Sequence, residues 1–224
     1  MSSAPVLAVD GPGGAGKGTL CREVAERLDW HLLDSGALYR LVAVAAQQSG
    51  TEIEDEAGLA ALARDLPARF EGERVFLGEE DVSRLIRTEE CGERASRVAT
   101  LPAVRTALVG LQRSMRRPPG LVADGRDMGT VIFPDAELKV FLTASARERA
   151  MRRYKQLKEK GFDVSLDGLS AEVAARDRRD AERAVAPLRP APDACVIDST
   201  ELSIDQVVEQ VLAELGRRGL YSGA

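Results

Sequence analysis

The chain has few aromatic residues, a single histidine and three cysteines. Aromatics make up 4% of its 224 residues, so we expect a core built mainly from Ala, Val and Leu. The cysteines Cys21, Cys91 and Cys195 are scattered and form no C-x-x-C pair. This spacing argues against a disulfide framework or a cysteine zinc site and indicates reduced thiols. We therefore expect a cytoplasmic protein.

Long apolar runs and an excess of positive charge are also missing. No run approaches the roughly 18 residues of a membrane span, and the N-terminus lacks the layout of a signal peptide. With 31 Lys+Arg against 36 Asp+Glu, the net charge of −5 argues against a general nucleic-acid or membrane binder. Residues 147–160 nevertheless hold seven bases and two acids, which indicates either local anion binding or a solvated helix face. We expect one monomeric domain over 1–224 whose partners are small molecules.

Short apolar runs alternate with helical patterns along most of the chain. Such runs, each followed by a helical segment, are typical of strands buried on both faces of a parallel sheet. The expected strands are Val6–Val9, Leu32–Leu33, Leu121–Ala123, Leu138–Leu142 and Ala194–Ile197. The sequence therefore predicts an α/β fold in which helices flank a parallel sheet.

One stretch, residues 64–99, breaks this alternation. Arg69–Leu77 and Val82–Ile86 are short strand-like runs, and a helix capped near Thr88 follows them. We expect a hairpin-plus-helix insertion that stands apart from the main sheet. The alternative is that this stretch simply continues the main domain.

A glycine-rich segment lies between the first expected strand and the first expected helix. It fits the pattern G-x-x-x-x-G-K and consists of Gly11, Pro12, Gly13, Gly14, Ala15, Gly16, Lys17, Gly18 and Thr19. Glycines let backbone N–H groups approach phosphate oxygens, the helix N-terminus adds partial positive charge, and a lysine adds a full one. The letters Gly11-x-Gly13-x-x-Gly16, with Asp34 downstream, also satisfy the dinucleotide fingerprint. Lys17 favours a nucleoside triphosphate, because that lysine has no role in the dinucleotide interpretation.

The residues available around such a triphosphate indicate the type of acceptor. Arginines fall in or near expected strand ends and helix starts, whereas the only histidine, His31, lies in an expected strand and is interpreted as structural. Transfer to a hydroxyl usually requires a positioned base. A phosphate oxygen is already an anion, and cations can hold two anions in line. The pattern favours a kinase with a phosphate acceptor.

Three residues near the C-terminal part of the chain share one helical face. Arg176, Asp180 and Arg183 follow the spacing i, i+4 and i+7. Two guanidiniums flanking a carboxylate suit a phosphorylated ligand. A surface ladder of ion pairs is the alternative, and spacing alone does not decide between them.

Four motifs together resemble the bacterial cytidylate kinases. They are the loop ending in Lys17-Gly-Thr19, Asp34-Ser-Gly-Ala-Leu-Tyr-Arg40, Gly125-Arg-Asp-Met-Gly-Thr130 and Arg183-Ala-Val-Ala-Pro187. The resemblance covers nearly the whole chain. It implies a P-loop kinase with a five-stranded parallel sheet, an α+β acceptor-binding insertion at 64–99 and a lid at 152–166.

The resemblance also implies the residues of the site. Lys17 would be catalytic and the loop from Gly11 to Thr19 would hold ATP. The acceptor residues would be Ser35, Arg40, Ser96, Arg105, Arg126, Asp127, Arg176, Asp180 and Arg183. Asp124, at the end of an expected strand, would hold Mg²⁺ through water.

The implied reaction is transfer of the ATP γ-phosphate to CMP or dCMP, giving ADP and CDP or dCDP, with Mg²⁺. Three alternatives stay open at this point. They are a kinase for another nucleoside monophosphate, a kinase for a hydroxyl acceptor and a regulator that binds ATP without catalysis.

Overall fold

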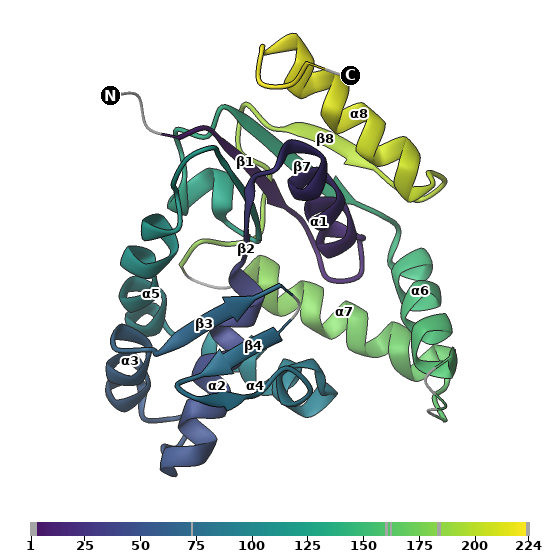
Figure 1. The fold of residues 1–224 in the computed structure, drawn as a ribbon. Helices are drawn as coiled ribbons and strands as arrows, with labels where there is room; N and C mark the ends of the chain where they lie inside the picture. Colours follow the sequence, from purple (N-terminus) through teal and green to yellow (C-terminus); the bar gives the residue numbers. More distant parts are fainter. Residues whose placement is uncertain (1–3, 73, 160, 162, 183–184, 223–224) are drawn as a thin grey trace. The chain divides into compact units, whose positions relative to one another are not determined.

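The computed structural model describes residues 4–72, 74–159, 161, 163–182 and 185–222. It divides into two compact units (Figure 1). The first unit joins Met1–Leu33 to Met115–Ala224, and the second is Asp34–Ser114. Each unit is described by itself below.

The first unit is built on the predicted five-stranded parallel sheet. Its strand order is β2-β6-β1-β7-β8, and β1 pairs in parallel with β6 and β7. Since the strands run the same way, their carboxyl ends meet at one edge, where α/β proteins usually bind ligands. The strands are β1 Val6–Asp10, β2 His31–Asp34, β6 Leu121–Gly125, β7 Leu138–Thr143 and β8 Cys195–Asp198.

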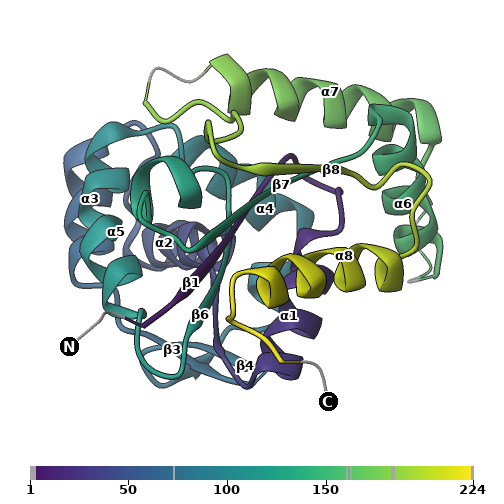
Figure 2. The same cartoon turned by 90° about the horizontal axis from the view of Figure 1, so that it is seen from above.

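Helices α1 (Lys17–Leu28) and α8 (Ile204–Arg217) lie beside each other against this sheet (Figure 2). Val24 of α1, Val140 of β7 and Val208 of α8 belong to one buried cluster. Aliphatic side chains dominate this cluster, as the scarcity of aromatic residues predicts.

The remaining helices of the first unit follow β6 and β7. The helical segment expected after β6 is a five-residue π-helix, η2 (Met128–Ile132). The Asp127 carbonyl accepts from the N–H groups of Val131 and Ile132, and the second of these bonds, from residue i+5, is the bond of a π-helical turn. Helices α6 (Ala146–Glu159) and α7 (Leu166–Glu182) contact each other.

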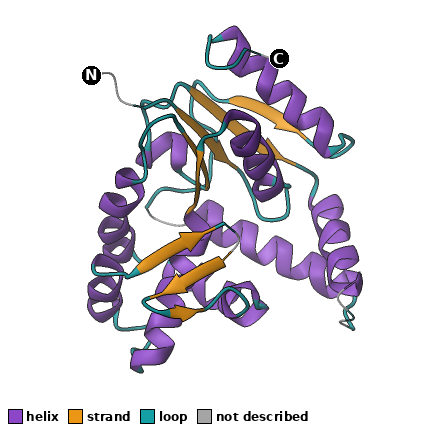
Figure 3. Cartoon of the chain, viewed as in Figure 1, coloured by secondary structure: helices purple, strands orange, loops and turns teal. Residues whose placement is uncertain are grey.

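The second unit contains the stretch expected to stand apart from the main sheet. There, an antiparallel sheet of order β3-β4-β5 is followed by helices (Figure 3). The compact unit starts at Asp34, so it is wider than 64–99. Its elements are α2 Ser35–Ser49, α3 Glu56–Arg64, β3 Ala68–Glu71, β4 Arg74–Leu77, β5 Glu80–Asp81, η1 Leu85–Arg87, α4 Glu89–Val98 and α5 Pro102–Ser114. Among the helices of both units that the structure describes, none combines the length and apolarity of a membrane span.

Candidate active site

The glycine-rich loop leaves β1 at the carboxyl edge of the sheet and enters α1 at Lys17. Gly11 has φ 149°, and a Cβ there would lie 2.0 Å from the Leu142 carbonyl oxygen, so no larger residue fits. Gly16, the N-cap of α1, has φ 98° and provides no side-chain cap. The first N–H groups of α1 are therefore available to an anion at the positive end of the helix.

Lys17 is buried at the start of this helix. Its Nζ donates to the Pro12 carbonyl oxygen at 3.1 Å and lies 3.7 Å from Asp124 Oδ1. Burial, together with the positive charge of Arg126, lowers the pKa of Lys17 to about 8, although the Asp124 carboxylate opposes the change. A lysine held this way is poorly solvated, and a bound phosphate would replace the missing water contacts.

Two arginines extend toward the same loop. A Cβ placed on Gly13 would lie 3.5 Å from both Arg126 Nη2 and Arg176 Nε. Both arginines also act electrostatically on Lys17 and lower its pKa. Three cationic side chains thus surround the middle of the loop, an arrangement suited to phosphates and costly without them.

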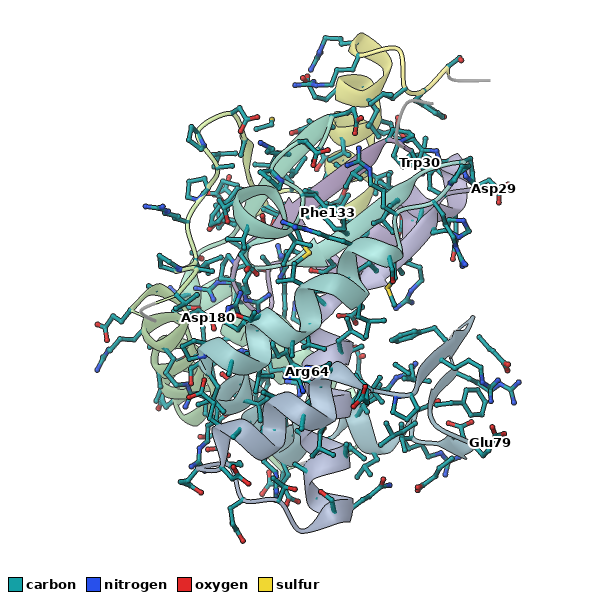
Figure 4. All side chains as sticks on the ribbon, turned by 90° about the vertical axis from the view of Figure 1, so that its left-hand side faces the viewer. Asp29, Trp30, Arg64, Glu79, Phe133 and Asp180 are labelled. Carbon is teal, nitrogen blue, oxygen red and sulfur yellow. The ribbon has the colours of Figure 1, made fainter. Side chains whose placement is uncertain are left out.

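Asp180 holds one of these arginines in place. Arg126 Nε donates to Asp180 Oδ2 at 2.9 Å, and the two side chains are 19% and 13% exposed. Although burial alone would lower the pKa of Arg126, the Asp180 carboxylate raises it and keeps the guanidinium charged. This partly buried pair joins α7 to the loop after β6 (Figure 4 labels Asp180), and an exposed surface ladder does not describe it. Arg183, the third predicted member of the face, lies outside the described residues.

Two further arginines, Arg149 and Arg152 of α6, also contact the glycine loop, and the sequence interpretation had missed their roles. Arg149 donates to the Gly13 carbonyl at 3.2 Å and binds Asp177 of α7 through two bonds of 2.9 and 2.5 Å. Arg152 Nη1 donates to the Ala15 carbonyl at 3.2 Å. Their i, i+3 spacing within the basic stretch 147–160 indicated that they share a helix face.

Asp127 and Asp10 lie next to this group of charges. Both side chains are buried. Asp127 immediately follows Arg126, and the next two backbone N–H groups, of Met128 and Gly129, donate to Asp10 Oδ1 at 2.7 Å and Oδ2 at 2.8 Å. Asp10 was not among the predicted site residues.

Four predicted acceptor residues belong to the second unit. Ser35 is buried in the first turn of α2. Arg40 donates to the carbonyls of Ile86 and Thr88. Arg105 is buried, donates to the Ala99 carbonyl at 3.0 Å and has its guanidinium 5.7 Å from the centre of the Tyr39 ring. Ser96 Oγ is buried and has no hydrogen-bond partner among the described residues, a state that is rare for a buried hydroxyl.

The acidic residues of the first unit suit a magnesium ion that arrives with a nucleotide. Within the ranges that the structure describes, no group of three or more His, Cys, Asp or Glu side chains could enclose a metal ion. Mg²⁺ in phosphoryl-transfer sites is usually held by one or two carboxylates together with substrate phosphates and water. Asp124, at the carboxyl end of β6 and beside Lys17, provides such a carboxylate.

A glycine-rich loop of this form, at the carboxyl edge of a parallel sheet and surrounded by arginines, defines a P-loop protein of the phosphotransferase type. The chain belongs to the cytidylate kinase family, whose sequence profile matches residues 7–217.

Individual relatives agree with this assignment. The chain is 61% identical over 212 residues to the cytidylate kinase of Methylococcus capsulatus (strain Bath), covering 93% of this chain and 96% of that protein. It is 58% identical over 214 residues to the cytidylate kinase of Aeromonas hydrophila subsp. hydrophila, covering 94% and 93%. An uncharacterized protein from Eubacterium ventriosum shares the fold alone, with a TM-score of 0.52 at 10% identity over 95% of this chain and 98% of that one.

Proposed function

We propose that this chain transfers the γ-phosphate of ATP to CMP or dCMP, giving ADP and CDP or dCDP. Family membership over residues 7–217 and the three cations around Gly13 carry the proposal. Two nucleotide phosphates repel each other, so the enzyme has to hold them in line and neutralise their charge. The acceptor oxygen is already anionic near neutral pH, and the transfer therefore needs no general base.

Each predicted site residue of the first unit has a proposed role in this transfer. The N–H groups from Gly13 to Thr19 bind the donor phosphates, and Lys17 stabilises the negative charge on the phosphoryl group during its transfer. Asp124 holds Mg²⁺ through water, and this ion neutralises and orients the donor phosphates when bound. The proposed acceptor contacts are Arg126 and Arg176 to the phosphate, Asp180 and Arg183 to the sugar, and Asp127 to the base.

The second unit is proposed to bind CMP through Ser35, Arg40, Ser96 and Arg105. The buried Ser96 hydroxyl, which has no partner among the described residues, supports this assignment. Ser96→Ala should raise the KM for CMP severalfold, because a hydroxyl bonded to the ligand contributes about 1 kcal/mol. An unchanged KM for CMP would remove Ser96 from the list.

A panel of acceptors tests the proposed function directly. ADP release would be measured with ATP, Mg²⁺ and each of CMP, dCMP, UMP, AMP and GMP. We expect CMP or dCMP to give the highest kcat/KM and EDTA to abolish turnover. A preference for AMP, GMP or UMP would reassign the acceptor, and no ADP release with any of them would leave a nucleotide-binding protein without this activity.

Two segments are proposed to close over the substrates, since water has to be kept from the γ-phosphate. They are the insertion at 64–99 and the lid at 152–166, which overlaps the basic stretch 147–160. Hydrogen exchange should show new protection in 64–99 with CMP and in 152–166 with a non-hydrolysable ATP analogue. Identical exchange with and without ligands would contradict both assignments.

We further propose that the protein works as a monomer in the cytoplasm and binds no nucleic acid. Its net charge of −5 and the scattered positions of its three cysteines, with no C-x-x-C pair, support this proposal. Light scattering at increasing concentration and a binding assay with single- and double-stranded DNA and RNA would test the first and last parts. Fractionation of cells that express the chain would test the location.

A further inference from the structure

Asp10 is the last residue of β1 and immediately precedes the glycine loop, and its side chain bonds to a different segment of the chain. Its side chain is 4% exposed. Both carboxylate oxygens accept backbone N–H groups from a segment more than a hundred positions away, Met128 at 2.7 Å and Gly129 at 2.8 Å. The two residues just before that pair of N–H groups are Arg126 and Asp127.

These bonds close a short frame around Arg126 and Asp127. On the upstream side, the backbone of Asp10 is in register with Gly125, the last residue of β6. On the downstream side, the carboxylate of the same Asp10 holds Met128 and Gly129. Arg126 and Asp127 therefore lie between two attachments to one residue, and the course of their backbone depends on it.

Stability does not explain a carboxylate at this place. Burial raises the pKa of Asp10 to about 6, although the N–H groups of Gly129 and Met128 lower it, while Asp127 raises it and Lys17 lowers it. Because folding raises this pKa above 3.8, the ionised carboxylate destabilises the folded state near neutral pH. Buried charges that destabilise a fold are typical of functional sites, where a defined geometry is needed.

We propose that Asp10 is a positioning residue for the phosphate acceptor: it fixes the segment from Gly125 to Gly129, so that Arg126 and Asp127 meet CMP in one geometry. The inference rests on the proposed function, since it assigns the acceptor to these two side chains. Asp10 itself touches neither substrate. It connects the end of the strand that carries the donor loop to the segment that carries the acceptor groups.

Asp10→Asn tests this role with little change in shape. The amide keeps one oxygen acceptor but turns an N–H₂ group toward the other backbone N–H, which pushes the segment away. We expect the KM for CMP to rise about tenfold, from the loss of one charge-assisted bond. The KM for ATP should change less than about twofold, because the glycine loop keeps its own contacts.

Glu137→Gln is the matched control. Glu137 Oε2 accepts the Val6 N–H at 2.7 Å, so it makes the same type of bond at the opposite end of β1. The control should leave both KM values unchanged, whatever it does to the melting temperature. Hydrogen exchange should speed up in 125–132 for Asp10→Asn and stay as in the wild type for Glu137→Gln.

The outcomes separate this inference from the proposed function. If the wild type phosphorylates no CMP, the function fails first. If the wild type is active and Asp10→Asn leaves the KM for CMP unchanged, or raises both KM values equally, Asp10 does not position the acceptor. If Asp10→Asn does not fold, amide exchange of Met128 and Gly129 in the wild type decides: protection at the level of β1 supports the frame, and rapid exchange overturns it.

Discussion

Arg126 binds Asp180 through one bond of 2.9 Å between Nε and Oδ2, and this bond leaves its Nη2 atom close to Gly13 of the glycine loop. The carboxylate therefore holds the guanidinium at Nε, and the Nη2 atom lies toward the glycine loop. Such a pair is better understood as a means of orientation than as a source of stability, since burying two charges costs about as much as their attraction returns.

A double-mutant cycle should measure this relationship. Arg126→Ala and Asp180→Ala should each lower kcat/KM for CMP, and the two changes should be coupled by about 1–3 kcal/mol because the residues act as a unit. The exposed pair Arg27–Glu209, 2.6 Å apart, is the control and should show little or no coupling in stability, with normal kinetics. Additive effects at Arg126 and Asp180 would contradict the orienting role.

Lys17→Ala should abolish most of the turnover and leave the fold intact. Its charge acts mainly in the transition state, and loss of one such contact costs roughly 3–4 kcal/mol, or about 10²–10³ in kcat. Circular dichroism and the melting temperature would check the fold. A variant that keeps more than about a third of the wild-type kcat would remove Lys17 from its assigned role.

The lowered pKa of Lys17 predicts a specific dependence on pH. In the free enzyme the lysine loses its charge as the pH rises through about 8, so kcat/KM for ATP should fall above that pH. Bound phosphates favour the charged form of Lys17. The fall of kcat at alkaline pH should therefore occur at a higher pH than the fall of kcat/KM. The free energy of unfolding should change in the opposite direction to activity and increase as the pH rises. Folding lowers this pKa from 10.5, so the charged lysine destabilises the free enzyme at neutral pH, and this destabilisation is relieved as the pH rises from about 8 toward 10.5.

Arg149 should be sensitive even to a conservative change. Arg149→Lys keeps the charge but cannot make both bonds to Asp177 or reach the Gly13 carbonyl with the same geometry. We expect a loss of stability of about 2 kcal/mol and a fall in kcat/KM for CMP of about tenfold, since Arg176 neighbours Asp177 on α7. Arg147→Lys, an exposed position on the same helix, is the control and should behave as wild type.

The sheet and the glycine loop could be predicted from the sequence because both depend on local patterns. A strand buried on both faces, such as Val6–Asp10, is a continuous apolar run, and the loop requires glycine at positions such as Gly11. The face shared by Arg176 and Asp180 also follows from spacing along one helix.

The side-chain partners could not be predicted in this way. Asp10 contacts Met128 and Gly129, and Arg149 contacts Asp177, across long sequence separations that no spacing rule reaches. The five-residue η2 was also hidden, since hydrogen bonds to the Asp127 carbonyl and not an apolar period define it.

The choice of base provides a further prediction. Cytosine carries an N4 amino donor where uracil carries an O4 acceptor, so a carboxylate facing that position favours cytosine and repels uracil. Asp127 is proposed to be this carboxylate. The alternative is that Asp127 serves only to orient its neighbour Arg126.

Asp127→Asn distinguishes these two roles, because an amide can turn its N–H₂ group toward uracil O4. If Asp127 reads the base, the ratio of kcat/KM for CMP over UMP should fall by at least about tenfold, which corresponds to roughly 1.4 kcal/mol of lost discrimination. Asp180→Asn is the comparison variant. It perturbs Arg126 through its other partner and should lower kcat/KM for CMP and for UMP by the same factor. If Asp127→Asn also lowers kcat/KM for CMP and for UMP equally, so that their ratio is unchanged, Asp127 orients Arg126 and another residue recognises the base.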